Sequence, residues 1–208
     1  MMIRRFLWAL VILFLIVALL VLPLSLVFDF HISQSQTNAS RQVSISRAVP
    51  GESQSQLPQS MQGQPALVYS VRGESRLAGA LRNTLGEQLD ANPVLGDVML
   101  LEPVSDFAHA SYLILEIQDA RVFWIPFYAT SDLQVNLAFA SDGDVSFRNQ
   151  PVSPMQTEDR QPLIRAQGQV LLTDRSWGLL SRPAYLRLIS ESLSVQINQA
   201  LDEIFQPE

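Results

Sequence analysis

The distribution of apolar and polar residues divides the chain into three regions. The first is an apolar run, Phe6–Phe28, whose only polar residue is Ser25 and which carries no charge. The second, residues 29–64, is rich in Ser, Gln, Pro and Gly. The third, residues 65–208, shows stretches of strand-like and helix-like periodicity. We therefore expect a single folded domain in the third region only.

The apolar run is long enough to span a bilayer, because about 20 apolar residues in a helix cross its hydrocarbon core. Arg4 and Arg5 precede the run, and positive charge tends to stay in the cytoplasm. Phe6–Phe28 is therefore predicted to be a single-pass signal-anchor in the inner or plasma membrane. Residues 1–5 would be cytoplasmic and the C-terminal domain extracytoplasmic. The alternative is a cleaved signal peptide, whose apolar region is normally shorter, about 7–15 residues.

Residues 29–64 are predicted to be a flexible tether. They contain few large apolar side chains, so their burial cannot offset the conformational entropy lost on ordering. The alternation of apolar and polar residues around Val43, Ile45 and Val49 leaves a short edge strand open as an alternative.

The third region predicts two helices and several strands. Leucines recur every four residues from Leu77 to Leu89, which is the spacing of one helix face. A second amphipathic helix is expected to begin after Ser181 and to end at Phe205. Strands are predicted at Ala66–Val71, Asp97–Glu102, Ser111–Trp124, Ala129–Ala140, Asp144–Arg148 and Arg165–Thr173. Asp142-Gly143 is a hairpin turn signal. This order favours an α+β fold in which two helices cover one face of a mostly antiparallel sheet.

The candidate chemistry of the chain is sparse. There is no Cys, and His31 and His109 are the only histidines. Phosphate-binding, dinucleotide-binding and zinc-protease motifs are absent from the sequence. Asp119 near Arg121 is typical of a surface ion pair, and Asp174 of a turn residue in a connector over residues 174–180. The carboxylates Asp142, Asp144, Glu158 and Asp159 fit turns or solvated loops better than an active site.

These observations predict a non-enzymatic protein without metal or cofactor. An enzyme that uses surface carboxylates stays open as an alternative, to be tested through His109 and Asp174. The net charge of −6 argues against nucleic-acid binding, since phosphate backbones select basic surfaces.

One stretch has more large apolar residues than a strand can bury. Residues 123–128 read Phe-Trp-Ile-Pro-Phe-Tyr, and the central Pro should interrupt a strand. We predict that Phe123, Trp124, Phe127, Tyr128 and Trp177 form a patch that binds a lipid-like ligand or a partner protein. The alternative is that these side chains fill the core.

The order of elements from Ala66 to Phe205 also carries a family resemblance. Its pieces are the Leu77–Leu89 helix, the Ala129–Ala140 strand, the Asp142-Gly143 turn and the final Tyr185–Phe205 helix. This order resembles the LPS-assembly lipoproteins and the auxiliary lipoproteins of ABC-type lipid transporters, although the chain lacks their lipidated Cys. The resemblance implies a membrane-anchored accessory protein that binds a lipid-like ligand or an envelope partner. Its partners would also include the bilayer itself, through Phe6–Phe28. The alternative is a structural scaffold subunit of a membrane complex.

Overall fold

The computed structural model describes residues 2–27, 29–48, 67–72, 75–92, 95, 97–100, 111–141 and 163–205. Its helices are α1 (Met2–Val27), α2 (Arg76–Asp90) and α3 (Arg182–Phe205). Its strands are β1 (His31–Ala48), β2 (Leu67–Arg72), β3 (Val98–Leu100), β4 (Ser111–Ile125), β5 (Tyr128–Ala140) and β6 (Leu163–Leu180).

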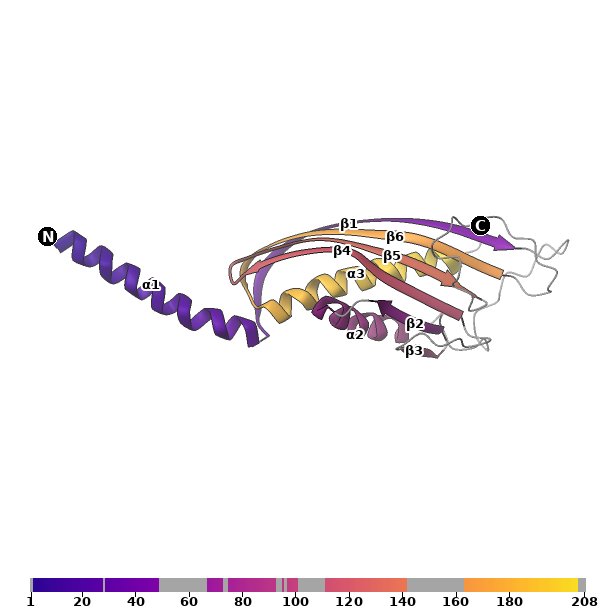
Figure 1. Cartoon of the computed structure of the whole chain (residues 1–208), viewed down its shortest axis with the longest axis horizontal. Coiled ribbons are helices and arrows are strands. Elements are labelled where there is room, and N and C mark those ends of the chain that lie inside the picture. The colour runs from indigo at the N-terminus through magenta and orange to yellow at the C-terminus, as the bar shows by residue number, and fades with distance from the viewer. Residues whose placement is uncertain are drawn as a thin grey trace.

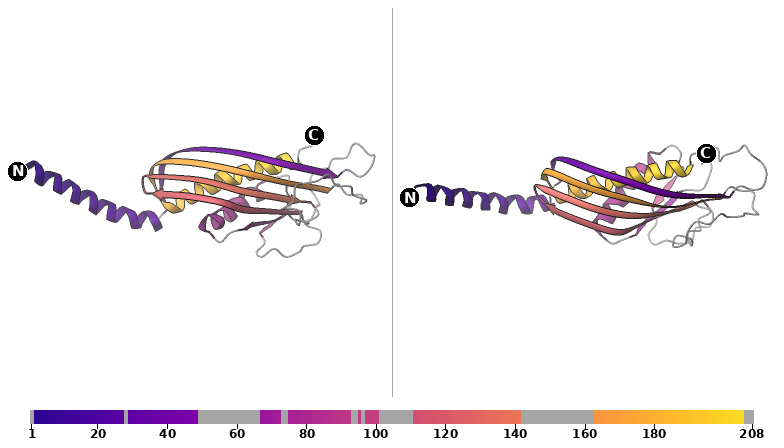
Figure 2. Two further views of the ribbon diagram at one scale, coloured as in Figure 1. Left: turned by 45° about the horizontal axis from the view of Figure 1, so that its top comes forward. Right: turned by 90° about the horizontal axis from the view of Figure 1, so that it is seen from above.

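The strands form one sheet in the order β1-β6-β5-β4-β2-β3. The four long strands pair antiparallel, whereas β2 runs parallel to both of its neighbours, β3 and β4. The long strands arch over α2 and α3, which lie side by side against the concave face (Figure 1). In all three views α1 extends away from the end of the sheet at which the β4–β5 turn lies (Figures 1 and 2).

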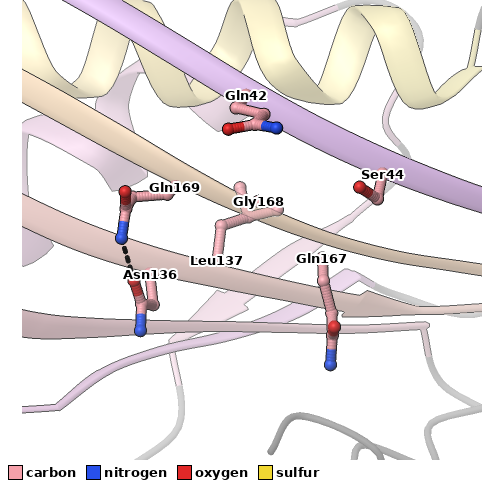
Figure 3. Close-up of a pocket in the computed structure, with 7 residues that line it drawn as sticks. All are labelled: Gln42, Ser44, Asn136, Leu137, Gln167, Gly168 and Gln169. Carbon is pink, nitrogen blue, oxygen red and sulfur yellow. Dashed lines mark hydrogen bonds between the residues drawn. The ribbon is translucent and has the colours of Figure 1, made fainter. Parts of the chain in front are cut away.

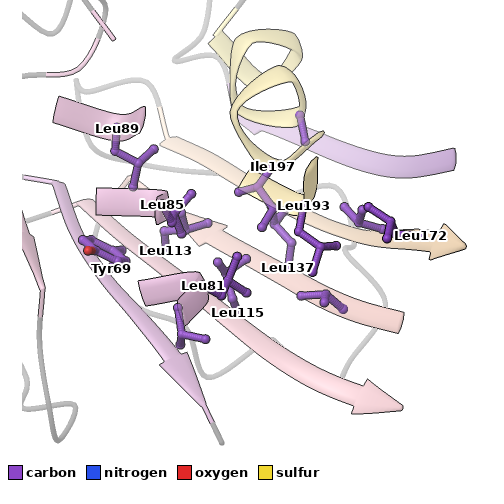
Figure 4. Close-up of a cluster of buried hydrophobic side chains, with 14 of the residues drawn as sticks. Tyr69, Leu81, Leu85, Leu89, Leu113, Leu115, Leu137, Leu172, Leu193 and Ile197 are labelled. Carbon is purple, nitrogen blue, oxygen red and sulfur yellow. The ribbon is translucent and has the colours of Figure 1, made fainter. Parts of the chain in front are cut away.

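The core fills the space between the sheet and the two helices (Figure 4). Leu81 and Leu85 of α2 are fully buried, as are Leu193 and Ile197 of α3. Leu137 faces them from β5. Each helix begins at a serine whose hydroxyl accepts a bond from a backbone N–H in the first turn, Ser75 for α2 and Ser181 for α3. The apolar stripe predicted on each helix is therefore the side of that helix that is buried in the common core.

The predicted fold class is wrong at the N-terminus, and its mostly antiparallel sheet is in fact mixed, with a parallel part at β2. α2 carries the chain back after β2, so that β3 runs parallel to β2, and β4 also runs parallel to β2 on its other side.

The predicted membrane anchor is also wrong. Among the residues whose placement the structure describes, no helix is long and apolar enough to cross a membrane. The single-pass, signal-anchored topology and the inner-membrane localisation that rested on it are overturned with it.

The tether prediction does not hold for its first half. His31–Ala48 forms β1, which pairs with β6 along its whole length, from His31 opposite Leu180 to Ala48 opposite Leu163. The alternative of a short edge strand in this region was correct in kind, but the strand is much longer than that alternative proposed. Backbone hydrogen bonds supply most of this pairing, and they do not require apolar side chains. Residues 49–64, including Val49, lie outside the described residues.

The predicted connector over residues 174–180 is also corrected, because β6 continues to Leu180 between β1 and β5. β6 continues through residue 178 with a φ of 128°, a backbone conformation that favours glycine, and residue 178 is a glycine. The Asp142-Gly143 turn and the strand predicted at Asp144–Arg148 lie outside the described residues.

Two glycines form a matched test of this backbone. A Cβ at Gly178 would collide with the Ile32 carbonyl oxygen and with Ser33, so we expect Gly178→Ala to lower the free energy of unfolding by at least about 2 kcal/mol. A Cβ at Gly79 in α2 would meet nothing within 4 Å. We therefore expect Gly79→Ala to raise the free energy of unfolding by about 0.5–1 kcal/mol. Urea unfolding followed by circular dichroism measures both changes. Effects of the same sign would contradict this account of β6.

Candidate functional site

The predicted aromatic residues lie at the end of the sheet formed by the β4–β5 turn. Phe123 and Phe127 are each 54% exposed and Trp177 is 62% exposed. The turn is held against β6 by two backbone bonds, from the Gly178 N–H to the Phe127 oxygen (3.1 Å) and from the Leu180 N–H to the Pro126 oxygen (2.9 Å). The aromatic side chains therefore project from a fixed backbone.

Three of the rings form a row across neighbouring strands. Tyr128 pairs with Trp177 in the sheet register, and their ring centroids are 4.2 Å apart. The Phe123 ring lies 6.4 Å from the Tyr128 ring on the other side. Ala129 and Ser176, the strand neighbours of Tyr128 and Trp177, are fully buried. Because side chains alternate along a strand, the row of rings lies on the other face of the sheet, away from α2 and α3.

Trp124 is the exception among the predicted site residues. Its indole Nε1 donates a hydrogen bond to the Leu180 carbonyl oxygen (3.0 Å), and its ring packs against the main core. The structure thus divides the predicted patch. Phe123, Phe127, Tyr128 and Trp177 come together at the surface, whereas Trp124 stabilises the end of the core.

Two further apolar side chains extend this surface. Ile125 precedes the turn and is 43% exposed, and Ile32 at the start of β1 is 74% exposed. We call Ile32, Phe123, Ile125, Phe127, Tyr128 and Trp177 the tip patch. Sequence reasoning missed Ile32 because it lies in the segment that was predicted to be a tether, where its only signal was an isolated apolar residue.

The structure also places the carboxylates that were considered as candidate chemistry. Asp119 forms an exposed ion pair with Arg121 at 3.2 Å, as predicted from their spacing. His109, Asp142, Asp144, Glu158 and Asp159 lie outside the described residues. Within the described ranges, no group of three or more His, Asp or Glu side chains could hold a metal ion.

Asp174 occupies an unexpected position. Its carboxylate is fully buried under β6 and accepts hydrogen bonds from the hydroxyls of Ser35, Thr37 (2.7 Å) and Ser176 (2.8 Å). Ser35 and Thr37 belong to β1, so the carboxylate fastens the edge strand to its neighbour. A buried carboxylate needs such donors to offset its lost hydration. Asp174 is therefore a structural residue, and the prediction of a turn residue was wrong.

Tyr185 of α3 lies next to this carboxylate. Burial raises the pKa of the Tyr185 hydroxyl above its ordinary value of 10.0; the Ser131 hydroxyl opposes the rise and the Asp174 charge adds to it. The hydroxyl oxygen is buried, and no described group forms a hydrogen bond of normal geometry with it. The neutral phenol is consequently the form that the fold accommodates.

We expect Asp174→Ala to lower the free energy of unfolding by about 3 kcal/mol, because the buried Ser176 hydroxyl and the Ser35 and Thr37 hydroxyls of β1 lose their acceptor. Urea unfolding measures the loss, and hydrogen exchange should show it first in β1. Asp132→Ala is the matched control, since this exposed carboxylate accepts a bond only at the surface, from Thr173. Its effect should stay within about 0.5 kcal/mol. Equal effects of the two substitutions would mean that Asp174 does not hold β1.

The raised pKa of Tyr185 predicts a loss of stability at alkaline pH. The unfolded chain releases this proton near pH 10 while the folded chain retains it, so the contribution is complete below pH 10 and declines as the pH rises above it. Tyr185→Phe should reduce the decline by up to about 1.4 kcal/mol per pH unit. At pH 7 it should change stability by less than about 1 kcal/mol. Urea unfolding between pH 8 and 11 measures both quantities, and an unchanged alkaline slope would contradict the prediction.

Comparison with known proteins adds little to this geometry. No family model matches the chain. No curated protein matches it either. Among solved structures, a single-residue variant of the PelC dodecamer from Paraburkholderia phytofirmans superposes with a TM-score of 0.39 at 11% identity. That match covers 79% of this chain and 98% of the other. A second PelC dodecamer structure from the same organism gives a TM-score of 0.37 at 15% identity, covering 76% and 97% of the two chains. Likeness at this level carries no argument about function.

Proposed function

We propose that the chain is a non-enzymatic binding protein that takes up an apolar, lipid-like ligand at its tip patch. The observation that carries this proposal is the exposure of Phe123, Phe127 and Trp177 together at one end of the sheet. Large apolar side chains that gather at a surface usually mark an interaction site. The proposal concerns binding by the folded domain and does not depend on a membrane-spanning segment.

The composition of the tip patch suits a lipid–water boundary. Tyr and Trp have rings with an apolar body and one polar group, so they are stable where an apolar phase meets water. Phe127 sits at the turn itself, where it can enter an apolar phase without moving a strand. The formal charge of −6 argues that apolar contact, rather than attraction to anionic headgroups, supplies the affinity.

A scaffold role in a larger assembly is the second candidate. The outer edge of β1 has no neighbouring strand in the described sheet. An edge of this kind can add a strand from another protein through backbone hydrogen bonds. The tip patch would then be part of a protein interface, in which aromatic residues often supply most of the affinity.

Tryptophan fluorescence can test the lipid proposal at one residue. In the full chain, Trp8→Phe and Trp124→Phe leave Trp177 as the single tryptophan. On addition of phosphatidylcholine vesicles, we expect its emission to shift to the blue and to be quenched by bromine on the acyl chains. Phe127→Ser should raise the vesicle concentration needed by about tenfold, since burying one Phe contributes about 1.5–3 kcal/mol.

Val195→Ser in the same background is the control, because Val195 is an exposed apolar residue of α3, 38% accessible and outside the tip patch. It should leave the quenching of Trp177 unchanged. If bromine on the acyl chains does not quench Trp177, or if Phe127→Ser has no larger effect than Val195→Ser, the tip patch does not bind lipid.

A further inference from the structure

The sheet face opposite α2 and α3 carries a second surface, centred on the middle of the long strands. A shallow cavity of about 290 Å³ lies there across β1, β6 and β5 (Figure 3). Gln42 and Ser44 line it from β1, Gln167 and Gln169 from β6, and Asn136 from β5. Leu137 and Gly168 complete the lining.

The lining of this cavity is polar but uncharged. It consists of four amide side chains and one hydroxyl, and each amide offers both hydrogen-bond donors and an acceptor. Gln169 donates a bond to Asn136 (3.3 Å), which orients two of the amides relative to each other. Such a lining matches a ligand whose own groups are uncharged and both donate and accept, as neighbouring hydroxyls do.

The same chemistry continues along β1. The register places Ser40 and Asn38 next to the cavity on this face, opposite Leu171 and Thr173 of β6, and then Gln36 and Gln34, opposite Arg175 and Trp177. All four β1 side chains are exposed, uncharged and polar. At about 3.3 Å per residue, the row from Gln34 to Ser44 is roughly 33 Å long. A surface of this length suits an extended polymer better than a single small molecule.

Other classes of ligand fit this face poorly. A lipid would meet a mostly polar lining in the cavity, and a nucleic acid would meet an acidic chain of net charge −6. Stable protein interfaces have an apolar or aromatic centre, whereas the centre of this face is polar and exposed Leu171 lies at its side. We therefore propose that the open face of β1, β6 and β5 binds an uncharged polysaccharide, with Gln42, Asn136 and Gln169 as its central contacts.

Affinity electrophoresis of the folded full chain tests this proposal. The native gels contain one of a panel of soluble neutral polysaccharides (dextran, mannan, galactan or xyloglucan), and alginate serves as the charged comparison. We expect slower migration with at least one neutral polysaccharide and none with alginate. Gln169→Ala and Asn136→Ala should each weaken the retention by about three- to tenfold, as expected for the loss of a neutral hydrogen bond.

Two control variants separate this site from other surfaces. Gln118→Ala removes an exposed amide of β4 outside the cavity and should leave retention unchanged. Phe127→Ser removes a tip-patch residue and should also leave it unchanged, so the polysaccharide and lipid proposals can fail independently. Absence of retention by every neutral polysaccharide in the panel, or retention that survives the Asn136→Ala and Gln169→Ala double substitution, overturns the proposal. Self-association of the chain through this face, removed by the same double substitution, would overturn it as well.

Discussion

The attachment of β1 to β6 is the constraint on which both candidate surfaces depend. β1 has polar side chains on most of its length, and Val43 is the one of its described side chains packed against the main core, so burial of apolar surface contributes little to its attachment. Its backbone pairs with β6 over 18 residues, and the buried Asp174 carboxylate accepts bonds from two of its hydroxyls. Arg41 extends the attachment to α3, where it contacts Glu203, Gln196 and Gln199. Without this strand, Gln42 and Ser44 would not line the open face, and Ile32 would not join the tip patch.

The sheet separates two kinds of surface by the alternation of its side chains. Residues such as Leu133, Val135 and Leu137 on β5 face the helices, and their neighbours Gln134 and Asn136 face away. Toward the β4–β5 turn, the outward positions change from polar to aromatic, at Tyr128 and Trp177. The same sheet therefore carries a polar face along its middle and an apolar patch at its end. These are the two surfaces of the described fold that we propose as binding sites.

The aromatic stretch shows how far sequence reasoning reached at the site. The run from Phe123 to Tyr128 identified the correct region because it held more large apolar residues than one strand face can bury. It could not tell which of them were exposed, because a turn at Pro126 and the pairing with β6 decide which way each ring points. Trp124 consequently lies against the core, while Trp177, about 50 residues further along the chain, packs against Tyr128 with its ring tilted.

The sequence by itself determined the helices and strands whose apolar periodicity is strong. α2, α3 and β5 begin and end within a few residues of their predicted bounds, because each needs only a local pattern and a cap or turn. Tertiary structure alone decided the elements that local composition does not favour. β1 is a strand because the edge of β6 offers backbone partners, and Asp174 is buried because hydroxyls from β1 and β6 converge on it. The parallel placement of β2 and the open polar face likewise arise from contacts between residues far apart in the chain, which no local pattern encodes.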